Sequence, residues 1–380
     1  MKEARTDSMA RAKRKKTAQS RPDIHAVARH AKVSIATVSR TINRVPTVDP
    51  KLAQRVWKAI EDLGFSPNTQ ARTLVSGKSR LLGLIVSEIT NPFFPELIQG
   101  FEEVAVENGY EILIGSTNYD PRRMEVCIQR MLERKVDGVA VMTFGIETPL
   151  LDRLAARDVP LVFVDNCPKG SLFSSIEVDY FHGIREGVQH LAVLGHRKIG
   201  FISGPLHLYS SQARQKAFLR ALAEVGLEAN PEWLREGNHT LEGGIATMKD
   251  TLRAEDLPTA MMCSNDMTAI GVLHALYGTG YKVPQDFSVI GFDDVNIAQF
   301  MLPPLTSVLM SRRELSRCAV MALRDHLEPQ ASVQQRYTVT TKLTVRQSTG
   351  YPRQKARTAS LPKASARSKA MQAEGTRDAY

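Results

Sequence analysis

Residues 22–44 read PDIHAVARHAKVSIATVSRTINR, and this stretch decides the fold of the N-terminal part of the chain. Apolar side chains recur in it at helical spacing in two short runs. The runs are Ile24, Val27, Ala28 and Ala31, then Val33, Val38 and Ile42. Asp23 and Ser34 stand where the N-caps of two helices are expected. Helices this short can bury their apolar sides only against each other and a third helix, for which residues 52–63 supply the stripe Leu52, Val56, Ile60 and Leu63.

The second helix, about Ser34–Asn43, is the one expected to contact DNA. In a helix-turn-helix, the second helix enters the major groove with its N-terminal residues at the base edges. Its outward side chains here are Ile35, Ala36, Thr37, Ser39 and Arg40. Arg40 is suited to bonding a guanine edge through two parallel hydrogen bonds, with a phosphate contact or a salt bridge as the alternative. Thr37, Ser39 and Asn43 carry short polar groups suited to phosphates, which position a helix without reading sequence.

The charge is divided unevenly along the 380 residues. The net charge is +10, from 50 Lys and Arg against 40 Asp and Glu. Residues 1–79 carry 17 basic and 6 acidic side chains, residues 80–349 carry 26 and 32, and residues 350–380 carry 7 and 2. Basic ends around a mildly acidic middle indicate a phosphate-binding segment joined to a module that does not bind DNA. For residues 1–21 and 350–380 taken alone, a solvated disordered tail is the simpler interpretation.

Composition excludes several classes of protein. A chain of this length indicates two or three domains. It contains no run of 18 apolar residues and no apolar segment near its N-terminus, so we expect neither a membrane span nor a signal peptide. The four cysteines (Cys127, Cys167, Cys263 and Cys318) are scattered without metal-ligand spacing, which suits a reducing cytoplasm and no metal site. No phosphate-binding or nucleophile motif of an enzyme is present, so we expect neither catalysis nor a cofactor.

From Leu81 onward, short apolar runs alternate with amphipathic helical stretches. The runs are LLGLIV, YEILIG, GVAVM, PLVFVD, KIGFIS, TAMMCS and FSVIGF. Continuous apolar strands separated by helices are typical of parallel sheets covered on both faces. Seven or more units over about 270 residues favour two doubly wound halves, although periodicity alone does not exclude a barrel. A ligand of such a pair is expected between the halves, at the carboxyl ends of the strands.

Several motifs in register resemble the LacI/GalR (lactose-repressor) family of bacterial transcription regulators. Residues 33–43 match the pattern V-S-x-x-T-V-S-R-x-x-N, and residues 65–74 match F-x-P-N-x-x-A-R-x-L. Six stretches carry the resemblance through the rest of the chain to about Gly350: TNPFF, RKVDGV, LGHRKIGFISGP, CSNDMTAIG, VPQDFSVIGFDD and PPLTSV. The resemblance implies an all-α helix-turn-helix domain followed by an α/β periplasmic-binding-protein-like core of two doubly wound parallel-sheet subdomains.

The resulting domain prediction has five parts. Residues 1–21 form a disordered basic arm, 22–66 the helix-turn-helix domain, 67–79 a hinge helix, 80–349 the effector-binding and dimerisation core, and 350–380 a disordered basic tail. Within the core, the N-subdomain is expected at about 80–180 and 307–327. The C-subdomain is expected at about 181–306 and 328–349.

The family pattern assigns roles near the DNA. It places Ile35 and Ala36 at the variable, sequence-selecting positions. Being apolar, these side chains are expected to contact thymine methyl groups or to exclude polar base edges; packing of Ile35 within the small domain is the alternative. It usually has Gly where this chain has Lys32, and Asp where it has Ala26. If Lys32 must adopt a positive φ, it carries a steric cost that Gly avoids.

The segment 68–76 is predicted to be the hinge. It is too short to be stable as an isolated helix. The resemblance implies that two copies fold and pair in the minor groove, with Leu74 as a wedge between central base pairs. A buried packing leucine is the alternative for Leu74. The other hinge residues expected at the DNA are Asn68, Ala71 and Arg72.

Polar groups at strand ends are the candidate effector contacts. They are Asp165, Arg214, Asn265, Asp266 and Asp293, with Phe93 and Phe94 as an apolar wall. Carboxylates and a guanidinium converging on one cleft suit bidentate bonds to vicinal hydroxyls. Alternatively, Asp266 caps the following helix and Phe94 belongs to the core.

The family implies a homodimer that binds a pseudo-palindromic operator and a small-molecule effector. Leu208 and Met262 stand where the family's purine repressor has an arginine and an aromatic residue, so we expect a sugar or sugar derivative rather than a purine. The function predicted is therefore an effector-controlled transcriptional regulator, most often a repressor in this family. The competing classes are a solute-binding protein and an enzyme on the same scaffold.

Overall fold

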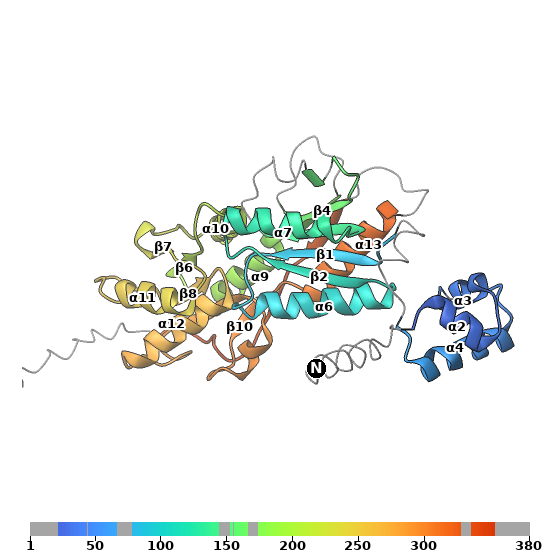
Figure 1. Cartoon of the computed structure of the whole chain (residues 1–380). Helices are drawn as coiled ribbons and strands as arrows, with labels where there is room; N and C mark the ends of the chain where they lie inside the picture. Colours follow the sequence, from blue (N-terminus) through green and yellow to red (C-terminus); the bar gives the residue numbers. More distant parts are fainter. Residues whose placement is uncertain are drawn as a thin grey trace, which may run out of the picture. The chain divides into compact units, whose positions relative to one another are not determined.

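The computed structural model describes residues 22–43, 45–66, 78–143, 153–154, 156–165, 174–327 and 336–353. They belong to two compact units, Met1–Ser79 and Arg80–Tyr380 (Figure 1). None of the described helices is long and apolar enough to cross a membrane.

The described part of the first unit contains three helices, α2 (Ile24–Ala31), α3 (Ile35–Ile42) and α4 (Pro50–Leu63). The predicted caps are confirmed, since Asp23 accepts a hydrogen bond from the Ala26 amide at 2.7 Å and Ser34 from the Thr37 amide at 3.1 Å. The apolar stripes meet in one small core of Val27, Ala28, Ala31, Val38, Val56 and Ala59, with Leu63 among the partly buried side chains around it.

The first sheet of the second unit has the strand order β11-β5-β4-β3-β1-β2, with all neighbours parallel. Its strands are β1 (Leu81–Val86), β2 (Glu111–Ser116), β3 (Gly138–Met142), β4 (Leu161–Val164), β5 (Ser174–Asp179) and β11 (Arg336–Thr340). Helices α6 (Phe93–Glu107), α7 (Pro121–Glu133) and α13 (Arg312–Leu327) pack against it. We call this sheet and these helices the N-subdomain.

The second sheet has the order β12-β10-β9-β8-β6-β7, and only β12 runs antiparallel to its neighbour. Its strands are β6 (Ile199–Ser203), β7 (Leu234–Glu236), β8 (Ala260–Cys263), β9 (Ser288–Asp293), β10 (Thr306–Leu309) and β12 (Lys342–Thr344). The helices of this C-subdomain are α9 (Tyr180–Val193), α10 (Tyr209–Glu224), α11 (Leu241–Thr251) and α12 (Asp266–Gly278), with short 3-10 turns η1 (Pro231–Trp233) and η2 (Asn296–Phe300). Two open sheets confirm the doubly wound prediction and exclude a barrel.

The chain crosses between the sheets near residues 180, 311 and 341, which corrects two predicted subdomain boundaries. Strand β10 pairs with β9 and so belongs to the C-subdomain, whereas the predicted N-subdomain segment began at 307. Strand β11 pairs with β5 in the N-subdomain, whereas the predicted C-subdomain segment began at 328. An apolar run identifies a strand but does not identify the strand beside which it lies.

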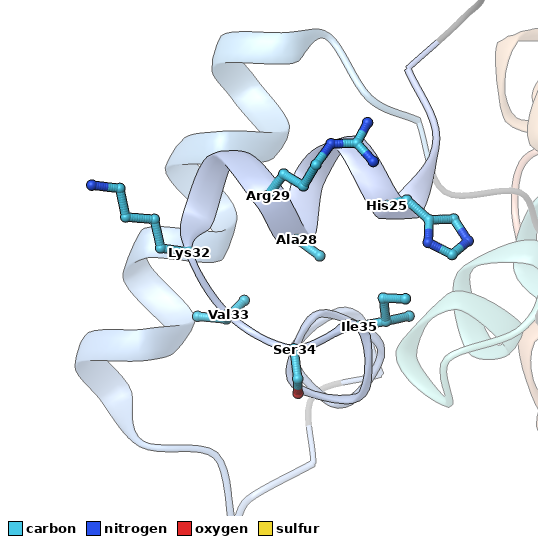
Figure 2. A pocket seen from close by; sticks show the side chains of 7 residues that line it. All are labelled: His25, Ala28, Arg29, Lys32, Val33, Ser34 and Ile35. Carbon is cyan, nitrogen blue, oxygen red and sulfur yellow. The ribbon is translucent and has the colours of Figure 1, made fainter.

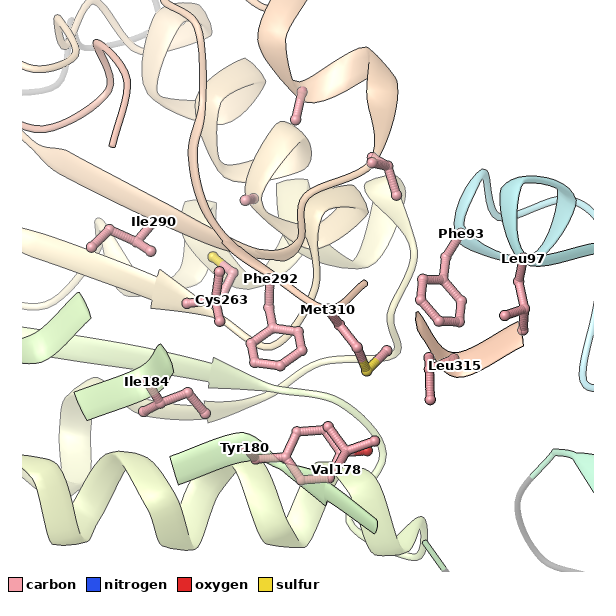
Figure 3. Packing of buried hydrophobic residues seen from close by; sticks show 14 of the residues in the cluster. Phe93, Leu97, Val178, Tyr180, Ile184, Cys263, Ile290, Phe292, Met310 and Leu315 are labelled. Atoms are coloured by element: carbon pink, nitrogen blue, oxygen red, sulfur yellow. The ribbon is translucent and has the colours of Figure 1, made fainter. Parts of the chain in front are cut away.

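One apolar cluster continues through both subdomains. Figure 3 shows Met310 between Phe292 of β9 on one side and Phe93 of α6 and Leu315 of α13 on the other. Residues near the second crossover therefore contact the helices of one subdomain and the sheet of the other. Burial of such apolar side chains is worth about 1.5–3 kcal/mol each.

Candidate DNA-reading surface and effector site

Helix α3 turns its predicted outward residues away from the small core. Ile35, Ala36, Arg40 and Asn43 are exposed, and Thr37 and Ser39 are partly exposed. Val38 and Thr41 are buried and anchor the opposite side of the helix. Ile35 is 42% exposed, so the alternative that it packs within the small domain is wrong. The surface is thus free to enter a groove, and the contacts of its residues with DNA stay predictions.

The turn between α2 and α3 contains the predicted positive-φ lysine. Lys32 has φ 52° and ψ 51°, which is left-handed backbone that favours glycine. The guanidinium of Arg55 in α4 donates to the main-chain oxygens of Ala31 at 2.5 Å and Lys32 at 3.2 Å. Since these carbonyls lie at the end of α2, Arg55 satisfies groups that the helix itself leaves unpaired.

A shallow hollow lies on the surface at this turn, lined by His25, Ala28, Arg29, Lys32, Val33, Ser34 and Ile35. Figure 2 shows His25 of α2 and Ile35 of α3 facing each other across one side of it. His25 and Arg29 were not predicted from the sequence, although their spacing of four residues puts them on one face of α2. With Lys32 they add basic groups beside the N-terminus of α3, a suitable place for a phosphate.

The hinge residues Asn68, Ala71, Arg72 and Leu74 lie outside the described residues, so their roles stay predictions. The two described residues at the end of the predicted hinge, Lys78 and Ser79, have no regular secondary structure and lead into β1.

Two of the predicted effector carboxylates follow the carboxyl ends of strands with unusual backbone. Asp165 follows β4 with φ 64°, and Asp293 ends β9 with φ 104°, followed by Asp294 with φ 54°. Positive φ costs a non-glycine residue free energy and is concentrated at functional sites. The two aspartates therefore hold the strained positions expected of a ligand site.

Arg214 is the central group of the candidate effector site. It lies on α10, is buried, and places its Nη2 3.5 Å from Oδ1 of Asp293. Its guanidinium carbon lies 4.0 Å from the ring centre of Phe292 and 5.1 Å from that of Tyr180, and Nη1 donates to the Ser264 carbonyl oxygen. Arg214 Nε and Ser211 Oγ, on the same helix, are buried without a hydrogen-bond partner among the described residues. Both atoms thus retain unused hydrogen-bonding capacity inside the protein.

Burial changes the acidity of both carboxylates. It raises the pKa of Asp293 from 3.8 to about 6, against the opposing effect of Arg214 and Arg312. It likewise raises the pKa of Asp165 to about 6, although the Tyr180 hydroxyl and the Val178 amide both donate to that carboxylate. Both groups are thus ionised at pH 7 but close to titration. Tyr180 thus contacts both groups, since its hydroxyl donates to Asp165 and its ring, like that of Phe292, lies against the Arg214 guanidinium.

Asn265 and Asp266 are positioned by the start of α12. Asn265 is the N-cap, accepting from the Thr268 amide at 2.9 Å and donating to the His239 carbonyl oxygen at 2.9 Å. Asp266 is completely buried; its carboxylate accepts from the Val295 amide at 2.8 Å and from the Ser307 hydroxyl at 2.5 Å. Asp266 therefore links the ends of neighbouring strands and does not face a ligand, which differs from its predicted role. The helix cap predicted as its alternative role is made by Asn265.

Phe93 and Phe94 begin α6 and pack edge to face, with ring centres 5.3 Å apart. Both are buried within the apolar cluster shared by the subdomains. This supports the core alternative for Phe94 and gives Phe93 a packing role toward the second crossover (Figure 3).

His239, which sequence reasoning missed, lies beside Arg214. It follows the short edge strand β7, has φ 64°, and its Nε2 lies 2.9 Å from the Ser264 hydroxyl. Burial and the positive charge of Arg214 lower its pKa to about 3, so it is neutral. The only signal for His239 in the sequence was its position as a polar residue shortly after the three-residue strand β7. Met262 is fully buried in β8, close to Gly187 of α9, so its identity says little about the effector.

No group of three or more metal-ligating side chains occurs within the described ranges. The chemistry of the site is therefore described by its hydrogen-bonding groups: one guanidinium, two carboxylates, a neutral imidazole and a serine hydroxyl.

Comparison with known proteins identifies the family. A model for bacterial regulatory proteins of the lacI family matches residues 23–68, and a model for a periplasmic binding protein-like domain matches residues 188–349. The HTH-type transcriptional repressor PurR of Haemophilus influenzae (strain PittEE) is 34% identical over 326 residues, covering 85% of this chain and 97% of that protein. The chain belongs to the lacI family.

Other members agree in sequence and fold with this lacI-family chain. Catabolite control protein A of Priestia megaterium is 33% identical over 305 residues, covering 80% of this chain and 92% of that protein. The lac repressor dimer bound to operator and the anti-inducer ONPF matches with a TM-score of 0.76 at 26% identity, covering 87% of this chain and 99% of that one. A complex of the transcriptional regulator CelR with cellobiose matches with a TM-score of 0.65 at 28% identity, covering 86% and 100%. The chain is therefore a DNA-binding transcription regulator with a periplasmic-binding-protein-like core.

Proposed function

We propose that this lacI-family protein is a transcriptional repressor whose operator affinity is set by a small polyhydroxyl effector. The observation that carries the proposal is the pairing, in one chain, of an outward-facing α3 with a buried Arg214–Asp293 site at the carboxyl ends of β8 and β9. A solute-binding protein does not require an outward-facing DNA-recognition helix such as α3. The relatives named above are regulators, which disfavours an enzyme.

At the DNA, different residues make different kinds of contact. Ile35 and Ala36 contact base edges through apolar groups, and Arg40 bonds a guanine. Thr37, Ser39 and Asn43 bind phosphates, as do the basic groups His25, Arg29 and Lys32 around the hollow. A homodimer presents two α3 helices to a pseudo-palindrome, and the hinge residues Asn68, Ala71, Arg72 and Leu74 pair in the minor groove between them.

In the effector site, Arg214, Asp293 and Asp165 bind vicinal hydroxyls, with Asn265 holding the His239 loop in place. Ionised carboxylates and a guanidinium make charge-assisted hydrogen bonds that are about twice as strong as neutral ones. The cellobiose bound to CelR supports a carbohydrate. Because the chain shares 34% sequence identity with PurR, a heterocyclic base is the second candidate for the effector.

A mobility-shift titration tests the DNA part. The probe is the DNA upstream of the chain's own gene, with a scrambled duplex of equal length as the control. We expect Arg40→Ala to weaken specific binding tenfold or more, consistent with about 1–3 kcal/mol per bidentate base contact, and to leave scrambled DNA nearly unaffected. Lys58→Ala on the exposed side of α4 is the matched control. Absence of any specific shift by the wild-type chain, with and without each candidate effector, contradicts the proposal.

Thermal-shift screening tests the effector part. The panel contains monosaccharides, cellobiose, sugar phosphates and purine bases. A ligand present at 100 times its Kd adds about 2.7 kcal/mol of stability to the folded state, which is readily detected. Asp293→Asn must abolish the shift. Stabilisation by a purine base alone rejects the carbohydrate and retains the repressor.

A further inference from the structure

Arg312 lies at the second crossover between the subdomains. It is the first residue of α13, three residues after β10 ends, and α13 packs against α6 of the N-subdomain. Its side chain is only 14% exposed. A guanidinium in this position is held by one subdomain and is able to reach the other.

The guanidinium of Arg312 contacts the strained turn after β9. Nη2 donates to the Asp294 carbonyl oxygen at 2.9 Å, and Nη1 donates to the Asp293 carbonyl oxygen and, at 3.2 Å, to that of Met310. Asp293 and Asp294 are the two positive-φ residues at the end of β9. Arg312 therefore binds the backbone of the residue whose side chain pairs with Arg214.

Glu96 of α6 completes the contact from the N-subdomain. One carboxylate oxygen lies 2.9 Å from Arg312 Nη2, and the other accepts a hydrogen bond from the Asn296 amide at 2.8 Å. Glu96 is 27% exposed, so this ion pair is partly shielded from water. Two side chains of the N-subdomain thus hold both ends of the turn 293–296, which belongs to the C-subdomain.

We propose that Arg312 and Glu96 form a latch between the subdomains that fixes the orientation of Asp293 and transmits its occupancy to α6. The coupling role rests on the effector site proposed above. A ligand that binds the Asp293 carboxylate displaces the main-chain carbonyl of Asp293. The Arg312 guanidinium, which binds that carbonyl, then shifts with it and displaces α13 and, through Glu96, α6. Both residues act through Asp293 and are positioning residues, with no ligand contact of their own.

Hydrogen exchange of the full chain, without any ligand, tests the latch. We expect Arg312→Ala and Glu96→Ala each to accelerate exchange of the Asn296 amide and of peptides from α6 at least tenfold. The double variant should add less than twofold, since both substitutions break one unit. Arg312→Lys should show an intermediate acceleration, because an ammonium keeps the charge without the planar fork. Arg313→Ala and Glu102→Ala, exposed neighbours on the same helices, are the controls.

The outcomes separate the latch from the proposed function. Wild-type exchange in both single variants, or acceleration confined to the element that carries the substitution, overturns the latch. If the wild-type chain binds its operator, Arg312→Ala and Glu96→Ala must both shift operator affinity more than fivefold in the same direction, with unchanged affinity for random DNA. Unchanged operator affinity overturns the transmission step. A wild-type chain without specific DNA binding rejects the repressor, while the exchange data still decide the latch.

Discussion

Arg214 and Asp293 form a buried ion pair between α10 and the end of β9, with Nη2 and Oδ1 3.5 Å apart. At this distance the pair is loose, and the Nε of Arg214 lacks a partner among the described residues. A buried ion pair contributes little stability unless its remaining hydrogen bonds are satisfied. The arrangement is therefore better suited to receiving a polar ligand than to stabilising the fold.

The first prediction concerns Arg214. We expect Arg214→Ala to retain operator affinity within about twofold and to lose the response to effector, because the proposed role of the guanidinium is to bind the effector and not DNA. Operator titrations with and without the ligand found by screening measure both. Arg220→Ala, on the exposed side of α10, should behave as wild type. An unchanged effector titration of Arg214→Ala dismisses this role.

The second prediction concerns pH. Burial raises the pKa of Asp165 and Asp293 from 3.8 to about 6, so the folded chain binds more protons than the unfolded chain between these values. Stability from these groups is present below pH 4 and is lost as pH rises through 6, by about 2–3 kcal/mol each. Denaturant unfolding at pH 4.5, 5.5 and 7 measures the free energy of unfolding. Between these pH values it should fall less in Asp165→Asn than in the wild-type chain. Asp250→Asn, an exposed position, is the control. An identical pH slope in Asp165→Asn and wild type contradicts the assignment.

The third prediction concerns the turn at Lys32. We expect Lys32→Gly to stabilise the small domain by about 0.5–1 kcal/mol, because glycine adopts φ 52° without steric cost. The same change removes one charge, so the slope of log affinity against log salt should fall by about 1. Lys58→Gly, within α4, should instead destabilise by about 1 kcal/mol. A destabilised Lys32→Gly rejects the strain argument.

The fourth prediction concerns the hinge. Leu74→Ala should weaken operator binding much more than binding to random DNA, because only the specific complex admits a wedge between base pairs. Quantitative mobility shifts on both duplexes measure the ratio, and Val75→Ala is the neighbouring control. Equal losses on operator and random DNA count against the wedge.

The helix-turn-helix was predictable almost to the residue. Its helix ends are set by Asp23, Ser34 and Asp49, whose side chains bond amides two or three positions away. Such signals are local, so the sequence contains them in full. The positive φ of Lys32 was anticipated on the same basis, but its support by Arg55 was not, because that contact joins residues 23 and 24 positions apart.

The amino-acid sequence by itself determined the order of domains, the doubly wound class and the face that α3 presents, because each depends on a short-range pattern of apolar, capping and charged residues. Only the tertiary structure decided which sheet receives β10 and β11, that Asp266 is enclosed while His239 contacts Ser264, and that Glu96 holds an amide 200 positions away. These facts arise from pairings between distant segments, and the free energy of such a contact depends on geometry that neither segment specifies alone.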